Sequence, residues 1–303
     1  MRWSIIVCTH NRASDLRMVL SELAALDYAA DQFEVVVVDN ASTDNTQEVV
    51  RKARNAMAGL RSVREERIGL SHARNKGIAN AKGEFIAFID DDACPDIDWL
   101  KKLEEVFKEP RIACVGGMVR PSWRSLSGWP QWLHKRHICF YSVIEYGDHR
   151  ELHYPDYPVG TNIAFRRRVF DEVGSFNTEL GRTGDRLISG DETDLCLRLE
   201  RAGYAVRYTP DAVVHHNVHE ERLNKKWLIR RSYWQGASVA IIEKVYFAES
   251  KIVFRTVKYL LFIVAGGFGK LLFSLIRNEK MSFFCACQVE LCKAYIAKAW
   301  GKR

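Results

Sequence analysis

Three adjacent aspartates, Asp90, Asp91 and Asp92, are the strongest chemical signal in this chain of 303 residues. Neighbouring carboxylates repel one another, and burying them without a counter-charge is costly. A divalent cation that bridges to phosphate oxygens removes that cost, and hard oxygen ligands suit Mg²⁺ or Mn²⁺. The triplet ends an apolar run at residues 85–89 that is typical of a buried strand. We therefore expect a metal site here rather than a solvated acidic turn.

Two other polar clusters also come directly after apolar runs. Residues 9–12 follow the run at 4–8, and residues 39–44 follow the run at 33–38. In an open parallel sheet, ligands bind at the carboxyl ends of the strands. We therefore expect both clusters to meet the aspartate triplet at one edge of a sheet, where the three loops form a single site.

The elements that must position these clusters alternate between strand and helix. The run at 33–38 is too continuous for a half-exposed strand and indicates a strand buried on both faces. Helical periodicity at 14–26, and helical segments that end near residues 57 and 81, separate the apolar runs. This alternation predicts a doubly wound α/β fold with right-handed crossovers.

The charge of the chain is unevenly distributed. Residues 222–303 contain 16 Lys and Arg against 4 Glu and no Asp, whereas residues 1–221 contain 29 basic and 34 acidic residues. Such a basic tail suggests an anionic surface as partner, and its apolar runs favour a membrane over nucleic acid. A hydrophobic fraction of 47% argues against wholesale disorder.

Eight cysteines are scattered along the chain without a CxxC pair, so a structural zinc site has little support. The first residues do not have the pattern of a secretory leader, because a polar cluster follows the short run at 4–8. We read the cysteines as reduced, mostly buried thiols of a cytoplasmic protein.

Six short motifs occur in a fixed order along the chain. They are SIIVCTHNR at 4–12, VVDNASTD at 37–44, GLSHARNKG at 69–77, FIDDD at 88–92, GDETDL at 190–195 and PDAVVHH at 210–216. Any one of these motifs alone would be a weak signal. The ordered set resembles the inverting family 2 glycosyltransferases over about residues 4–219.

The resemblance implies a GT-A fold, with a mostly parallel central sheet flanked by helices. Residues 1–220 would form the catalytic domain, with a nucleotide-binding half at 1–115 and an acceptor half at 116–220. Residues 221–303 would form a helical, basic extension that associates with a membrane.

The resemblance also implies where the nucleotide of a sugar donor binds. Thr9, Asn11 and Arg12 would lie beside the nucleobase and ribose. Asp39 would accept a hydrogen bond from the same groups, although a helix N-cap is an alternative role for it. Arginine suits the diphosphate because a guanidinium pairs with two phosphate oxygens at once. The remaining nucleotide contacts that the resemblance implies are Ser42, Arg74, Asn75, Asp90 and Asp91.

The implied metal site is the Asp-x-Asp motif formed by Asp90 and Asp92, with Mn²⁺ or Mg²⁺ as the ion. Asp92 would be the more direct ligand and Asp90 would lie nearer the ribose. His216 aligns with the histidine that often completes the metal or diphosphate contact in this family, and a purely structural role is the alternative. His215 and His219 have no assigned role.

An inverting transfer needs a carboxylate that takes the acceptor proton while the hydroxyl attacks the anomeric carbon. The family motif is usually Glu-Asp, and this chain has Asp191-Glu192 in the reverse order. By position Glu192 is the candidate base, and Asp191 is the alternative. Both residues also fit the acidic first turn of a helix.

Two residues of a further segment are candidates for contact with the donor or acceptor sugar. Gly160 would allow close approach of a ligand, and Asn162 would bind a sugar hydroxyl or serve a turn. The tryptophan-rich stretch at 123–132 could stack on a sugar, lie on a bilayer or fill a core.

The basic tail contains an uncharged run of eleven residues at 259–269, between Lys258 and Lys270. A spanning helix needs about 20 apolar residues, so this run is short for that purpose. For the segment 257–276 we favour a helix or a broken helical hairpin in the membrane interface. Packing on protein is the alternative. A last amphipathic helix is expected around residues 289–300.

These observations favour transfer of a sugar from a nucleoside diphosphate, preferably a UDP-sugar, to a lipid-linked or polysaccharide acceptor. We expect the protein to be peripheral on the cytoplasmic face of the membrane. A non-catalytic sugar-nucleotide-binding partner would lack the metal motif or the base, and neither is missing here. A nucleotidyltransferase would normally have a glycine-rich basic loop after the first strand, where this chain has residues 9–12.

Overall fold

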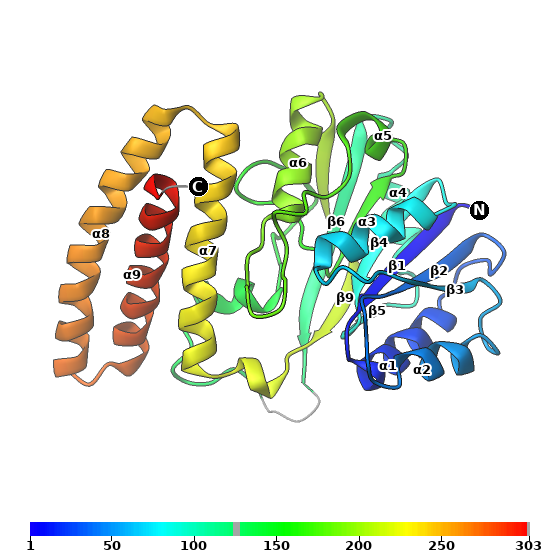
Figure 1. The fold of residues 1–303 in the computed structure, drawn as a ribbon, viewed down its shortest axis with the longest axis horizontal. Coiled ribbons are helices and arrows are strands. Elements are labelled where there is room, and N and C mark those ends of the chain that lie inside the picture. The colour runs from blue at the N-terminus through cyan, green and yellow to red at the C-terminus, as the bar shows by residue number, and fades with distance from the viewer. Residues whose placement is uncertain (124–127, 302–303) are drawn as a thin grey trace. The chain divides into compact units, whose positions relative to one another are not determined.

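The computed structural model describes residues 1–123 and 128–301. The chain divides into two compact units. Unit 1 contains Met1–Ser122, Ser142–Glu179 and Asp191–Asn217, and unit 2 contains Trp123–Tyr141, Leu180–Gly190 and Val218–Arg303. Figure 1 shows the sheet of unit 1 and the three long helices of unit 2.

Unit 1 is built on a nine-stranded sheet in the order β3-β2-β1-β4-β8-β6-β9-β5, with β7 also paired to β9. Its strands are β1 (Trp3–Thr9), β2 (Phe33–Asp39), β3 (Leu60–Arg64), β4 (Phe85–Asp90), β5 (Ala93–Pro95), β6 (Ile112–Ser122), β7 (Arg150–Leu152), β8 (Ile163–Arg166) and β9 (Ala205–Asn217). Its helices are α1 (Ala13–Ala24), α2 (Thr46–Ala53), α3 (Leu70–Asn80), α4 (Trp99–Val106), α5 (Val169–Val173) and α6 (Asp191–Arg201).

The first half of the sheet has the predicted doubly wound arrangement. Strands β3, β2, β1 and β4 are parallel, and a helix connects each of them to the next along the chain. Strand β2 is buried along its whole length. Ile5 and Val7 pack in one core cluster with Leu16 and Val49 of α1 and α2, and α3 packs on β1 and β2. The sheet between helices that the sequence predicted is therefore confirmed.

The second half of the sheet is mixed. Strand β8 is antiparallel to β4 and β6, and β5 and β7 are antiparallel to β9, whereas β6 and β9 run parallel. Beyond β4 the strands are joined mostly by loops and short helices. A parallel crossover needs about a dozen residues or more, and only Asp91 and Asp92 lie between β4 and β5, so these two strands cannot form a parallel pair.

Unit 2 is a bundle of α7 (Lys225–Tyr246), α8 (Glu249–Leu275) and α9 (Glu279–Trp300), to which the 3₁₀ helices η1 (Lys135–Tyr141) and η2 (Glu220–Arg222) are added. Figure 1 shows α7, α8 and α9 in yellow, orange and red. A Cβ atom added to Gly236 of α7 would lie 2.0 Å from the Leu291 carbonyl oxygen. Glycine therefore lets α7 and α9 approach closely.

The segment 257–276 lies mostly in a single helix. The sequence left open a broken helical hairpin, but α8 continues without a break through Gly266 and Gly267. Gly266 faces Val289 of α9, and Gly269 faces the Cys285 sulfur. Glycine costs about 1 kcal/mol in a helix interior relative to alanine, and close packing on α9 offsets that cost here.

The described tryptophans of the stretch at 123–132 pack inside unit 2. Trp129 lies 5.2 Å from Tyr141 between ring centroids, and Trp132 lies 5.3 Å from Phe283. With Leu228 and Cys287 they belong to one apolar cluster. Of the three roles that the sequence allowed, core filling comes closest for Trp129 and Trp132 in this structure, although both are only partly buried. Residues 124–127 of that stretch lie outside the described residues.

Candidate active site

The register of the sheet brings the polar clusters of unit 1 to one edge. Thr9 at the end of β1 pairs with Asp39 at the end of β2, and Cys8 pairs with Asp90 at the end of β4. The loops that follow these three strands therefore begin side by side. Strand β5 pairs with β9 so that Ala93 lies opposite His216, which brings His216 beside the aspartate triplet.

Asp90, Asp92 and His216 form a cluster that could hold a metal ion. One ligand atom from each lies within 4.8 Å of the others. His216 Nε2 is 3.3 Å from Asp92 Oδ1, and both side chains are buried. His216 Nδ1 has no hydrogen-bond partner among the described residues. Two carboxylates with an imidazole nitrogen are a donor set that fits a divalent cation such as Mn²⁺.

The charges around this cluster are only partly balanced. Arg12 pairs with Asp92, and its Nη1 lies 3.5 Å from Asp91 Oδ1. Burial, together with the charge of Asp92, raises the pKa of Asp91 to about 7, although Arg12 opposes the shift. The raised pKa expresses the repulsion expected of adjacent aspartates. Arg12, which the sequence placed beside nucleobase and ribose, therefore lies against the candidate metal ligands.

Thr161 contributes to the same cluster although the sequence analysis did not single it out. Its hydroxyl donates to Asp90 Oδ2 at 2.5 Å. The residue is buried just before β8, which lies next to β4 in the sheet. Its place between Gly160 and Asn162 was the available signal, but only the pairing of β8 with β4 shows which threonine reaches the site.

The candidate base pair, Asp191 and Glu192, opens helix α6 and binds Arg74 of α3. Arg74 Nη1 contacts Asp191 and lies 2.9 Å from Glu192 Oε1. Glu192 also accepts a hydrogen bond from the Gly160 backbone N–H at 2.9 Å. The Arg74 and Asp191 side chains are 3% and 2% exposed, whereas Glu192 is 16% exposed. Glu192 is therefore the more accessible carboxylate of the two.

The two carboxylates have opposite pKa shifts. Burial and the charge of Glu192 raise the pKa of Asp191 to about 7, against the opposing charge of Arg74. Burial would also raise the pKa of Glu192, but the charge of Arg74 and further hydrogen bonds lower it to about 2. Glu192 therefore stays ionised at neutral pH.

Gly160 is needed for the protein's own contacts. A Cβ atom at this position would lie 1.6 Å from Arg74 Nη2 and 2.5 Å from Glu192 Oε1. The sequence analysis assigned the close approach at Gly160 to a sugar ligand. In the structure, the guanidinium of Arg74 approaches Gly160, and the contact with a sugar stays a prediction.

Asp39 and Ser42 organise the loop after β2. Asp39 is fully buried and accepts from the Ser42 N–H at 2.8 Å and from Arg64 Nη1 at 3.0 Å. Ser42 Oγ accepts from the Asn11 N–H at 3.0 Å, and Asn11 Oδ1 accepts from the Thr43 N–H at 2.7 Å. These bonds connect the loops after β1 and β2. The N-cap position of α2 is Asn45, so Asp39 does not have the alternative capping role.

Asn40 is a second residue that the sequence analysis missed. Its Oδ1 accepts from the Gly69 N–H at 2.9 Å, and its Nδ2 donates to the carbonyls of Glu65 and Arg67. Asn40 therefore connects the loop after β2 to the start of α3, the helix that carries Arg74. The residue lies inside the VVDNASTD motif, but the sequence does not show which loop it contacts.

Asn75 and Asn162 use their amides within the protein. Asn75 exchanges two hydrogen bonds with the Phe176 backbone, at 2.8 and 2.9 Å. Asn162 is fully buried, donates to the Met118 and Ala212 carbonyls and accepts from Trp99 Nε1. Both residues thus connect parts of the protein in this structure, and their contacts with a nucleotide or a sugar stay predictions.

Comparisons with known proteins show what the chain is similar to. The family model described as glycosyl transferase family 2 matches residues 4–174. A glucosyl-dolichyl phosphate glucuronosyltransferase of Haloferax volcanii is 31% identical over 256 residues, covering 81% of this chain and 79% of that protein. The succinoglycan biosynthesis protein ExoM of Rhizobium meliloti is 30% identical over 233 residues, covering 76% of this chain and 71% of that protein.

A solved structure shows the same fold over the whole chain. It is a mannosyltransferase from Pyrobaculum calidifontis in complex with GDP-mannose and Mn²⁺, with a TM-score of 0.63 and 22% identity. The match covers 100% of this chain and 88% of that one. The predicted GT-A architecture, a sheet flanked by helices with a helical C-terminal part, is therefore confirmed.

Proposed function

The chain belongs to glycosyl transferase family 2, and on this premise we propose that it is a metal-dependent, inverting enzyme. The donor is a nucleoside diphosphate sugar, preferably a UDP-sugar, and the acceptor is a hydroxyl of a lipid-linked or polysaccharide saccharide. The acceptor class is supported by relatives whose names contain a dolichyl phosphate and a bacterial polysaccharide. The enzyme would act at the cytoplasmic face of a membrane.

The observation that carries this proposal is the arrangement of two carboxylate clusters in unit 1. Asp90, Asp92 and His216 would hold Mn²⁺ or Mg²⁺, and a bound cation would neutralise charge on the donor diphosphate. The second cluster, Asp191 and Glu192, is linked to the first through Gly160 and Thr161, adjacent residues that contact Glu192 and Asp90. One segment thus positions both the base and a candidate metal ligand.

Glu192 is the proposed general base. It is the more exposed carboxylate of the pair, and hydrogen bonds from Arg74 and from the Gly160 N–H hold it in place. It would accept the proton of the acceptor hydroxyl as that oxygen attacks the anomeric carbon, opposite the departing diphosphate. Asp191 is the alternative base, and in the proposal it holds the guanidinium of Arg74.

Arg12 and Arg74 are the cations available beside the two clusters. Each is paired with carboxylates in the structure, Arg12 with Asp91 and Asp92, and Arg74 with Asp191 and Glu192. A guanidinium can bridge a carboxylate and a phosphate oxygen, because it has five N–H donors. We propose that both arginines keep these contacts and add a contact to the diphosphate.

The test is incubation of the purified full chain with UDP-, dTDP- and GDP-sugars and a lipid-linked or oligosaccharide acceptor. We expect metal-dependent release of the nucleoside diphosphate with one donor, and a product of inverted anomeric configuration. Binding of a nucleotide sugar without release in any acceptor mixture would favour the alternative, a non-catalytic sugar-nucleotide-binding partner.

A further inference from the structure

Helix α8 carries an apolar stripe on its outer side. Val253, Val257, Leu260, Val264, Phe268, Leu271 and Leu275 follow one another at spacings of four and three residues, which is the period of one helix face. All seven side chains are exposed, with Val264 at 74% and Leu275 at 73%. The opposite side of α8 packs on α9, where Tyr259 meets Tyr295 at 4.9 Å between ring centroids.

The stripe is large for a protein surface. Phe254, Leu261 and Leu272 widen it on one flank, and each is also exposed. Exposed apolar patches beyond a few hundred Å² are rare on monomeric soluble proteins and mark sites that bind a membrane or another protein. Within the described residues, α8 is the one helix whose length and composition would allow it to cross a membrane.

The lysines of α8 lie beside the stripe. Successive residues of a helix are rotated by about 100° around its axis. Viewed along the axis of α8, Lys258 and Lys270 therefore lie about 120° from the middle of the stripe, one on each side. Lysines so placed can extend along a lipid surface while their ammonium groups reach headgroups. They also leave only the eleven residues at 259–269 uncharged between them, fewer than the roughly 20 that a spanning helix needs. This arrangement fits a helix lying in the membrane interface.

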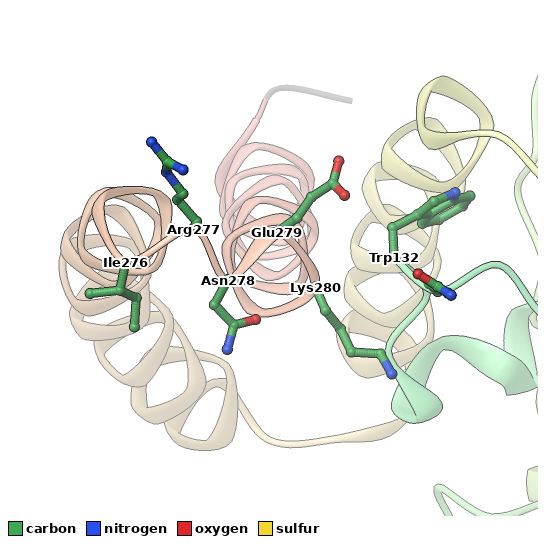
Figure 2. Close-up of a pocket in the computed structure, with 7 residues that line it drawn as sticks. Trp132, Ile276, Arg277, Asn278, Glu279 and Lys280 are labelled. Atoms are coloured by element: carbon green, nitrogen blue, oxygen red, sulfur yellow. The ribbon is translucent and has the colours of Figure 1, made fainter.

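A basic hollow lies where α8 turns into α9. It has a volume of about 460 Å³ and is lined by Gln131, Trp132 and residues 276–280. Figure 2 shows Trp132 on one side of the hollow and Arg277, Asn278, Glu279 and Lys280 on the other. Glu279 pairs with Lys225, and Asn278 caps α9 through the Met281 N–H.

Two cations of the hollow are available to a ligand. Neither the Arg277 nor the Lys280 side chain has an ion pair within the described part of the chain. Arg136 and Lys135 add positive charge close by. After burial, the charges of Arg136, Lys280 and Lys135 lower the pKa of His134. Positive charge next to aromatic and apolar side chains is typical of surfaces that bind anionic lipids.

We propose that the stripe of α8 and the basic turn after it form one docking surface for an anionic lipid bilayer. The stripe enters the boundary between headgroups and acyl chains, and Lys258, Lys270, Arg277 and Lys280 bind lipid phosphates. A second copy of the chain fits less well, because a two-fold contact through this surface would bring like charges together. The surface deepens the proposed function, since it holds the enzyme where a lipid-linked acceptor lies.

The experiment is co-sedimentation of the full chain with vesicles of phosphatidylcholine, with and without phosphatidylglycerol. We expect the wild type to bind the anionic vesicles at least tenfold more tightly than the neutral ones. V264E/F268E should lose binding to both kinds of vesicle. R277E/K280E should lose only the preference for anionic vesicles.

Control variants carry changes of the same kind elsewhere. I97E places a charge on an isoleucine of unit 1 that is 63% exposed, and K82E/K108E reverses two exposed lysines of unit 1. Both should bind vesicles like the wild type, and circular dichroism should show that every variant keeps its helix content. Because vesicle binding needs neither donor nor turnover, its failure leaves the proposed transfer reaction intact.

Two results would overturn the proposal. One is V264E/F268E binding vesicles as tightly as the wild type. The other is a lipid-free dimer in sedimentation velocity that V264E/F268E converts to a monomer, since the stripe would then be a contact between two copies of the chain.

Discussion

The sheet edge of unit 1 and helix α8 of unit 2 depart from the usual distribution of side chains in opposite ways. At the edge, Arg74, Asp92 and Asp191 are buried charges. Along α8, large side chains such as Val264 and Phe268 are exposed hydrocarbon. Charged groups are almost never fully buried unless they are paired, and large exposed apolar patches normally have a partner.

The difference shows what each region requires. At the edge the protein supplies its own partners, since each buried charge contacts an opposite one. A change to one member therefore affects the others. Along α8 the described residues supply no cover for the stripe, so its side chains contribute little to folding. Substitutions should therefore strongly lower activity or stability at the edge, whereas substitutions on the stripe should change stability little.

The largest effect is expected at the proposed base. Glu192→Gln keeps the size of the side chain but removes the charge that accepts a proton, and general base catalysis contributes about 10²–10⁴-fold. Transfer should fall by that factor while donor binding, measured by calorimetry, is retained. Asp191→Asn is the matched comparison. If Asp191→Asn is the inactive variant and Glu192→Gln turns over normally, the base is Asp191.

Next comes the candidate metal ligand Asp92. Loss of a residue that only supports a metal ligand typically lowers metal affinity or activity by about 10–100-fold. Asp92→Asn removes a proposed ligand itself, so it should lower the Mn²⁺ affinity by more than about 100-fold. Mn²⁺ titration followed by electron paramagnetic resonance measures the affinity directly. Asp211→Asn, at an exposed carboxylate of the same unit, is the control. Unchanged Mn²⁺ affinity in Asp92→Asn would remove Asp92 from the metal site.

The sequence allowed much of this edge to be anticipated, for a physical reason. Continuous runs such as 33–38, short and rich in valine, are typical of strands covered on both faces, and polar residues directly after such runs lie where the strands end. That reasoning places Asp39, Asp90 and Asp92 at one edge without any coordinates.

What the sequence did not show is how the loops at this edge are connected. Asn40 connects two loops, Thr161 reaches Asp90, and Arg64 binds Asp39. Each contact joins residues more than 20 positions apart, so it depends on which strands lie next to each other. A motif shows which type of residue stands at a position, but which other residue it contacts follows only from the fold.

Gly160→Ala tests how tightly the edge is packed. The added Cβ would overlap Arg74 Nη2 at 1.6 Å, so the guanidinium must move away from Asp191 and Glu192. Overpacking of this kind typically costs about 1–3 kcal/mol, which chemical denaturation should detect. Gly267→Ala on α8 is the matched control because nothing lies within 4 Å of its added Cβ. Alanine there should stabilise the helix by up to about 1 kcal/mol. Equal changes in the free energy of unfolding in the two variants would contradict the contrast between the sheet edge and α8.

The pH dependence of stability reports on the same pair. An aspartate of the unfolded chain titrates near pKa ~3.9, whereas Asp191 in the folded protein titrates at about 7. The folded state therefore binds this proton more tightly, and ionising Asp191 between these pH values destabilises the fold. Asp191→Asn removes that titration. The wild type should lose roughly 1 kcal/mol or more relative to Asp191→Asn as the pH rises from about 4 to 7.

The effect of Glu192 on stability has the opposite pH dependence. Its pKa is lowered to about 2, so its contribution to stability is present above the pKa of an unfolded glutamate and is lost only as the pH falls toward 2. The two residues therefore act in different pH windows. A stability difference between wild type and Asp191→Asn that grows on acidification below pH 4 would contradict the assignment to Asp191.

The smallest effect is expected on α8, where the contrast is sharpest. Val264 is 74% exposed, so Val264→Glu removes almost no buried hydrocarbon and introduces no desolvated charge. Substitutions at such surface positions usually change stability by less than about 0.5 kcal/mol. The midpoint of urea denaturation should therefore be nearly that of the wild type. A loss of 2 kcal/mol or more would mean that the stripe is covered in the free protein, and α8 would then be a core helix of an assembly rather than an exposed one.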